Sequence, residues 1–117
     1  MSDSVNKSEQ AFRELVRVLE NAVRARADSV GLEWEGGDLM VVHYFGSRGQ
    51  AAAAIPKDVE QALVDEIIVR AGLAQSPRGE MQINLTGKDY KVIVDERDSF
   101  GESAFNLTLK KSNRKGT

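Results

Sequence analysis

Residues 63–94 read LVDEIIVRAGLAQSPRGEMQINLTGKDYKVIV, and the spacing of the apolar residues changes within this stretch. Up to Ala71 apolar residues recur every three to four positions, which is typical of an amphipathic helix. Over Met81–Val94 they recur every second position, which is typical of half-buried strands. Gly72 is placed to end the helix, because glycine readily adopts the left-handed conformation of a helix C-cap. The stretch therefore predicts a helix followed by an antiparallel strand pair.

The residues on either side extend this pattern. Asn6 and Glu9 have the spacing of a capping box at the start of an N-terminal helix. Gly36-Gly37 and Gly87-Lys88 predict tight turns between strands, and Pro56 is suited to the first position of a helix. We expect, in chain order, a helix over 7–28, strands over 30–35, 39–45 and 50–55, a helix over 56–71, and strands over 81–85, 90–94 and 105–109, with loops over 46–49 and 95–101.

These elements indicate one fold class. Strands joined by short connections pair antiparallel, and two amphipathic helices bury their apolar sides by covering a sheet face. We predict an α+β two-layer sandwich, with a mostly antiparallel sheet covered on one face by two helices. The order is α-β-β-β-α-β-β-β, which is PAS-like. The 117 residues fit a single domain, and we expect disordered ends at 1–6 and 112–117.

Composition excludes several classes of site and partner. The chain has no cysteine and one histidine, which excludes thiolate chemistry and a multi-histidine metal site. Its net charge is −2, and its few aromatic residues are not interleaved with basic ones, so we expect no nucleic-acid binding. The longest apolar run, Ala51–Ile55, is too short for membrane insertion. The polar N-terminus shows no secretory signal, so we predict a cytoplasmic protein. We expect no metal and no cofactor.

Two groups of residues are candidates for ligand binding. Gly46-Ser-Arg-Gly49 could present converging N–H groups and the charge of Arg48 to an anion, with His43 nearby, although a plain loop explains it better. Asp95, Glu96 and Asp98 follow a strand and could bind a cation or act in acid–base chemistry. No nucleophile accompanies them, so a solvated loop is favoured. The phosphate-binding motif Gly-x-x-x-x-Gly-Lys-Ser/Thr is absent.

A second set of residues is a candidate interaction surface. Leu39–Phe45 is apolar on both sides of its strand, whereas the helices of this fold cover one face of the sheet. Some apolar side chains should then face outward, and an exposed apolar patch often marks a partner surface. The candidates are Trp34, Met40, Val42, Tyr44 and Ile93. Arg13, Arg17 and Arg24 share one helix side and could meet an acidic partner, but interspersed glutamates favour a solvated face.

The chain resembles the domain that precedes the ATPase core in type II secretion and type IV pilus assembly ATPases, over about 27–111. Ala27-Asp-Ser-Val-Gly-Leu-Glu-Trp34 is similar to the family motif Ala-Ser-Asp-Ile-His-Ile-Glu-Pro. A proline, a helix and an Ala-Gly-Leu end are matched by Pro56 through Leu73. Ser76-Pro-Arg-Gly79 is similar to the family turn Pro-Gln-Asp-Gly, and Gly101-Glu102 matches a Gly-Glu before the last strand.

The departures from the family concern its working residues. Gly31 replaces the histidine of the first motif, and His43-Tyr-Phe-Gly-Ser-Arg-Gly49 lacks at least one arginine of the corresponding strand end. Ile68 stands where the family has a lysine, and the arginine of the last strand is missing near 106–108. In the family such basic residues help to contact nucleotide on the neighbouring core. The resemblance therefore implies the scaffold without the nucleotide contacts.

Three functions follow as hypotheses. The favoured one is a non-enzymatic protein-interaction or adaptor domain, whose partner is a secretion or pilus-type ATPase or a second copy of itself. The alternative is a small-ligand or nucleotide sensor, with His43, Arg48, Gly46 and Gly49 as contacts. The least favoured is a small enzyme that uses His43 with Asp95 or Asp98.

Overall fold

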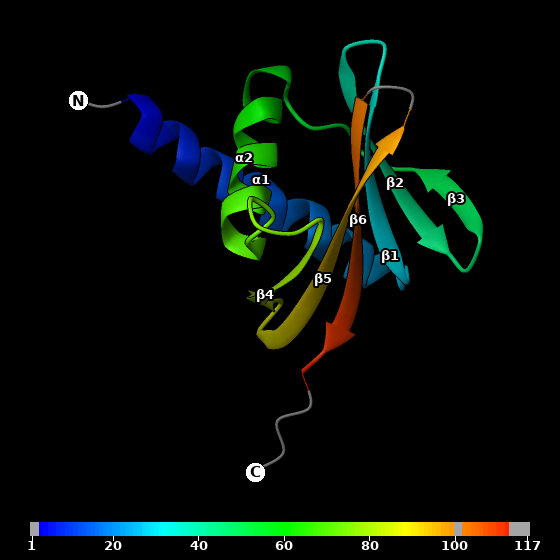
Figure 1. Cartoon of the computed structure of the whole chain (residues 1–117). Helices are drawn as coiled ribbons and strands as arrows, with labels where there is room; N and C mark the ends of the chain where they lie inside the picture. Colours follow the sequence, from blue (N-terminus) through cyan, green and yellow to red (C-terminus); the bar gives the residue numbers. More distant parts are fainter. Residues whose placement is uncertain (1–2, 100–101, 113–117) are drawn as a thin grey trace.

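Two helices lie across one face of a six-stranded antiparallel sheet (Figure 1). This computed structural model describes residues 3–99 and 102–112. The elements are α1 (Asp3–Ala25), β1 (Ser29–Glu35), β2 (Asp38–Phe45), β3 (Arg48–Ala51), a 3₁₀ turn (Lys57–Val59), α2 (Glu60–Ala71), β4 (Arg78–Leu85), β5 (Lys88–Ser99) and β6 (Glu102–Lys111). The predicted α+β class and the order of helices and strands are both confirmed.

The sheet joins two local meanders through its centre. Its strand order is β3-β2-β1-β6-β5-β4, and each neighbouring pair is antiparallel. The hairpins follow from short turns, such as the one at Gly36 and Gly37, which have φ of 61° and 88°. The β1–β6 pair is different, because it brings Leu32 opposite Phe105 from the other end of the chain.

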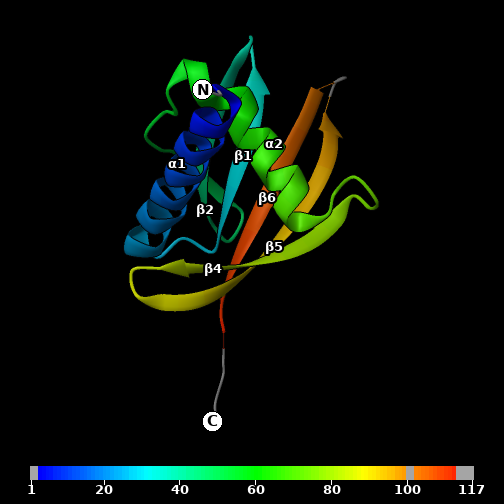
Figure 2. The ribbon, with the colours of Figure 1, turned by 90° about the vertical axis from the view of Figure 1, so that its left-hand side faces the viewer.

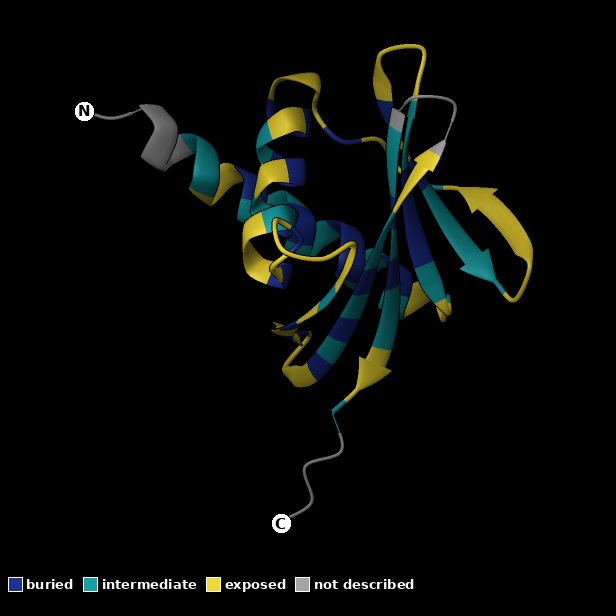
Figure 3. Cartoon of the chain, viewed as in Figure 1, coloured by how far each residue is buried: buried dark blue, intermediate teal, exposed yellow. Residues whose placement is uncertain are grey.

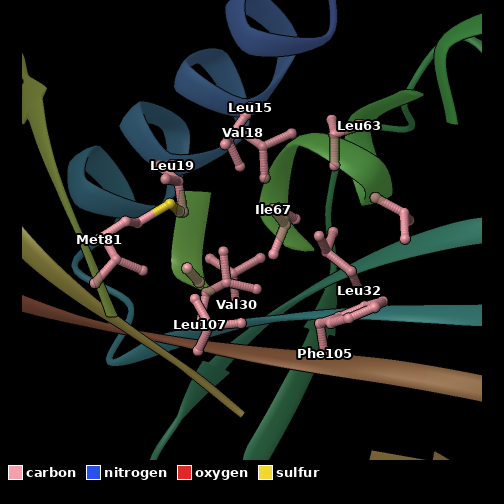
Figure 4. Close-up of a cluster of buried hydrophobic side chains, with 14 of the residues drawn as sticks. Leu15, Val18, Leu19, Val30, Leu32, Leu63, Ile67, Met81, Phe105 and Leu107 are labelled. Atoms are coloured by element: carbon pink, nitrogen blue, oxygen red, sulfur yellow. The ribbon is translucent and has the colours of Figure 1, made fainter. Parts of the chain in front are cut away.

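The core fills the space between the helices and the sheet. Figure 4 shows Leu15 and Leu19 from α1 and Ile67 from α2 facing strand side chains. These three leucine and isoleucine side chains are fully buried. The strands contribute a matching set on their helix-facing side, namely Val30, Leu32, Leu39, Val41, Met81, Ile83, Leu85, Val92, Val94, Phe105 and Leu107. Figure 3 shows this buried layer in dark blue, with exposed residues on the outer helix surfaces.

One contact sets how closely α2 approaches the sheet. The end of α2 lies against β4 at Gly79, where a Cβ atom would stand 1.8 Å from the carbonyl oxygen of Ala71. Gly72 ends the helix as predicted, with a left-handed φ of 70°. A side chain at position 79 would therefore collide with helix backbone that cannot rotate away.

A second contact fixes the start of α2. Glu60 is 6% exposed, and its carboxylate accepts a hydrogen bond of 3.0 Å from the backbone N–H of Leu39 in β2. The backbone N–H of Leu39 points toward the side of β2 on which β3 lies, but β3 does not extend as far as Leu39. The carboxylate thus replaces a missing strand partner, which matters because a buried N–H without a partner is costly.

Several predicted element boundaries were wrong. Helix α1 begins at Asp3, so Asn6 lies inside it rather than at its cap. Strand β3 takes in Arg48 and Gly49, which we expected in a loop, and it ends at Ala51. The second turn lies at Thr86-Gly87 instead of Gly87-Lys88. The expected disordered ends include 1–2 and 113–117, which lie outside the described residues.

The largest boundary error concerns β5. We expected a loop over 95–101, but β5 continues to Ser99 and pairs with β6 as far as Glu102. Its polar residues misled the prediction because this end of the hairpin projects past the helices, so neither face needs apolar side chains. The described residues contain no helix that is both long and apolar enough to cross a membrane.

Candidate binding face

Among the residues that the structure describes, one face of the sheet carries no helix. Figure 2 shows α1 and α2 together on a single side of the strands. Strand alternation and the pairing register place every second residue on the opposite side. We call this side the open face. It includes Ser29, Gly31 and Glu33 of β1, Met40, Val42 and Tyr44 of β2, Ile93, Asp95 and Arg97 of β5, and Ala104, Asn106 and Thr108 of β6.

The centre of the open face is hollowed. A depression of about 720 Å³ lies over β1 and β6, where the floor residues Ser29, Gly31 and Ala104 are small. Tyr44 and Glu33 border it on one side and Arg97 on the other, and Asn106 also lines it. A volume of this size is within the range of small-molecule sites and of pockets for a partner's side chains.

Tyr44 is held across the glycines of its neighbours. A Cβ on Gly31 would lie 2.8 Å from its ring, and a Cβ on Gly49 would lie 3.0 Å from it. The ring therefore covers backbone on both adjacent strands. Its hydroxyl donates a 2.8 Å hydrogen bond to Glu33. That hydrogen bond and partial burial raise the pKa of Tyr44, so the phenol stays protonated at neutral pH.

The charged groups of the hollow differ from those elsewhere on the sheet. Arg78 lies 3.6 Å from Asp95, and Lys91 lies 3.9 Å from Glu80. In residues 3–99 and 102–112, by contrast, no ion pair within 4 Å involves Glu33, Glu35 or Arg97, the charged residues that line the hollow. The hollow thus offers two acidic groups, Glu33 and Glu35, and one basic group, Arg97, around a small-residue floor to a bound molecule.

The predicted ligand residues do not converge on one site. Register places His43 and Arg48 on the helix-facing side of their strands, whereas Gly49 belongs to the open face beneath Tyr44. The N–H of Gly46 donates a 2.6 Å hydrogen bond to Asp28, so it is already occupied. Of the four residues, only Gly46 lines the hollow.

His43 makes stability depend on pH. Its Nε2 atom is buried with no hydrogen-bond partner among the described residues, and burial lowers its pKa below the ordinary value of 6.5. The unfolded chain therefore takes up a proton at higher pH than the folded chain. Stability is then fully present above about pH 7 and decreases as pH falls through 6.5 toward the lower folded pKa.

We expect urea midpoints of the wild type to fall between about pH 7.5 and 5.5. His43→Gln, which does not titrate, should reduce that decline. Equal declines for both proteins would show that another group is responsible.

The predicted interaction residues lie in three places: the open face, the end of β1, and the helical layer. Met40, Val42 and Tyr44 lie on the open face as expected, and Met40 is 37% exposed. Trp34 pairs with the core residue Leu39 and packs against the core, and it also lines the hollow.

The arginine stripe lies on the helical layer, away from the open face. Arg17 donates hydrogen bonds to Glu14 and to the carbonyl oxygen of Ala54. Arg24 donates one to Asn21, and Arg13 is exposed. Two of the three arginines are thus held by neighbouring groups.

The clustered carboxylates are divided by the strand. Asp95 lies on the open face, whereas Glu96 and Asp98 pair with residues on the helix-facing side. Within the described part of the chain, no group of three His, Cys, Asp or Glu side chains is arranged to hold a metal ion.

Sequence reasoning singled out Trp34, Tyr44 and Gly46 among the residues that line the hollow and missed the others. Ser29, Gly31 and Glu33 alternate along β1 with buried apolar residues, and Ala104 and Asn106 do the same along β6. The available signal was the run of small residues on the outward positions of two strands. It gains meaning only when β1 and β6 are known to be neighbours. Comparison with protein-family models and with curated proteins finds no match for this chain.

Proposed function

We propose that the chain is a non-enzymatic protein-interaction domain that docks a partner on the open face of its sheet. The observation that supports this proposal is the one-sided covering of the sheet together with the hollow at its centre. A partner surface placed there would bury Met40 and Val42 at the side and insert a polar side chain between Glu33 and Arg97. A mixed apolar and polar surface of this kind suits a non-obligate complex.

The electrostatics of the hollow favour binding over catalysis. Glu33 raises the pKa of Tyr44, which is opposite to what a nucleophile or general base requires. Tyr44 and Glu33 are also hydrogen-bonded to each other.

The partner class follows from the resemblance described above. We propose a secretion or pilus-type ATPase. Loss of the family's basic residues is consistent with contact to protein rather than to nucleotide. Cytoplasmic location and the absence of nucleic-acid binding remain predictions of the same proposal.

A pair of matched substitutions tests the docking face. Met40 and Val69 are the exposed large hydrophobic residues of the described chain, at 37% and 77% exposure, and they lie on the sheet and on α2 respectively. Met40→Glu should weaken binding of a candidate ATPase by about tenfold, since a charge would be buried at the interface. Val69→Glu should leave affinity unchanged. Titration calorimetry or biolayer interferometry measures both.

The opposite ranking would place the contact on the helical layer. A wild-type chain that binds none of the ATPases from its source would count against the partner class.

A small-ligand sensor is a second candidate, supported by the volume of the hollow. Its contacts would be Glu33, Tyr44, Arg97 and Asn106 rather than the four residues predicted from sequence. Calorimetry with ATP, ADP and cyclic dinucleotides, repeated with Arg97→Ala, tests this candidate. Absence of heat and of a thermal shift would remove it.

A further inference from the structure

We propose that the free edge of β3 binds the same edge of a second copy of this chain, which forms a two-fold symmetric dimer. Strand β3 is the first strand of the sheet order, so one of its sides has no neighbouring strand in the described part of the chain. Figure 3 shows it exposed along its length at the margin of the molecule. This surface is separate from the open face.

The outward backbone groups of β3 can be identified from the register. The N–H of Ala52 donates to the carbonyl oxygen of Val41, and the strand register pairs His43 with Gln50. Since antiparallel strands alternate their hydrogen-bonding direction, Arg48 and Gln50 direct their backbone groups toward β2. Gly49 and Ala51 then direct theirs away from the sheet.

These two residues are self-complementary. In an antiparallel dimer that places Gly49 opposite Ala51 of the second copy, these two residues form two backbone hydrogen bonds. The two-fold symmetry places Ala51 opposite Gly49 of the second copy, where two more form, so the total is four. The two-fold axis then passes between Gln50 and its copy. Each Gln50 amide carries both a donor and an acceptor, so two such amides can hydrogen-bond to each other.

The side chains also fit this register. Tyr44 covers Gly49, so a large residue opposite Gly49 would meet the ring, whereas Ala51 of the second copy leaves room. Arg48, the charged residue of β3, would stand opposite Ala52, and no like charges face each other.

The other edge of the sheet lacks this complementarity. Strand β4 has Arg78 and Glu80 on its exposed positions, and the backbone of Gly79 is covered by the end of α2. Charged residues and covering elements are the usual protection of an edge strand, and β3 has neither apart from Arg48. This contrast favours pairing at β3.

A charge-swap experiment at the axis tests the proposal. The interface is small, so we expect dissociation at about 0.1–1 mM, measured by sedimentation equilibrium. Gln50→Glu and Gln50→Lys each place like charges together and should weaken self-association by about tenfold. An equimolar mixture of the two variants should recover association to at least the wild-type level.

A variant that removes a backbone hydrogen-bond donor tests the dimer independently of side-chain charge. Ala51→Pro removes an outward N–H and keeps the ladder to β2, because proline is tolerated on an edge strand. It should weaken association as strongly as a single charge variant, with unchanged circular dichroism.

A wild type that stays monomeric at 1 mM would overturn the proposal. So would a dimer that persists in all three variants, or a mixture that fails to recover. An edge that captures only extended peptides of another protein would also overturn it. The Met40→Glu variant should dimerise normally. Failure of the dimer proposal can therefore be distinguished from failure of the proposed docking function.

Discussion

Gly79→Ala should reduce the free energy of unfolding by about 3 kcal/mol or more. The added Cβ would stand 1.8 Å from the carbonyl oxygen of Ala71 and 2.9 Å from its carbonyl carbon. Both are backbone atoms at the end of α2, so no rotamer change can relieve the overlap. The helix must move away from β4, which opens the packing of Ile67 and Met81. Urea unfolding followed by Trp34 fluorescence measures the loss.

Gly72→Ala is the matched control. Gly72 has a φ of 70°, but a Cβ there would meet nothing within 4 Å. It should cost about 1 kcal/mol, which is the usual penalty for a non-glycine residue in the left-handed region. Equal losses at the two positions would show that backbone conformation, rather than the close approach of helix and strand, governs Gly79.

Glu60→Ala should cost about 2–3 kcal/mol, because it leaves the buried N–H of Leu39 without an acceptor. The hydrogen bond of 3.0 Å joins the first turn of α2 to β2, so its loss also loosens that helix end. Glu60→Gln keeps a carbonyl acceptor and should cost about 1 kcal/mol. Thermal and urea unfolding of both variants give the comparison.

Gln61→Ala controls for a change in helix propensity at the next position. Gln61 is exposed and its side chain hydrogen-bonds Asp65, so its loss should stay within about 0.5 kcal/mol. Hydrogen exchange at Leu39 should quicken in Glu60→Ala and remain slow in Gln61→Ala. An unchanged Leu39 amide would contradict the role given to this carboxylate.

Most of the helices, strands and turns could be predicted from the sequence, because each is specified by residues within its own segment. Gly36-Gly37 and Gly72 act through their own backbone conformations, and the alternation in Met81–Leu85 needs only one covered face. The alternation of apolar and polar residues is lost where a strand is not covered by a helix. Residues 95–99 look like a loop because that end of β5 lies beyond the helices.

The candidate site was harder to predict, because it depends on which strands are neighbours. The open face could be assigned to Met40, Val42 and Tyr44, because β2 has apolar residues on both of its sides and the helices cover only one. Trp34 could not be assigned to one face from the sequence, since a strand residue near a turn packs on either face without changing the pattern. Glu33 and Arg97 border the same hollow only because β6 lies between β1 and β5.

The central position of β6 has a consequence for biosynthesis. Strand β6 inserts between β1 and the β4–β5 hairpin, so contacts such as Leu32 with Phe105 close only after residues 102–111 have been synthesised. Pairing of distant segments is slow relative to hairpin closure, because chain entropy must be lost first. A nascent chain on the ribosome therefore holds two incomplete halves of the sheet until β6 has been synthesised and can insert between them.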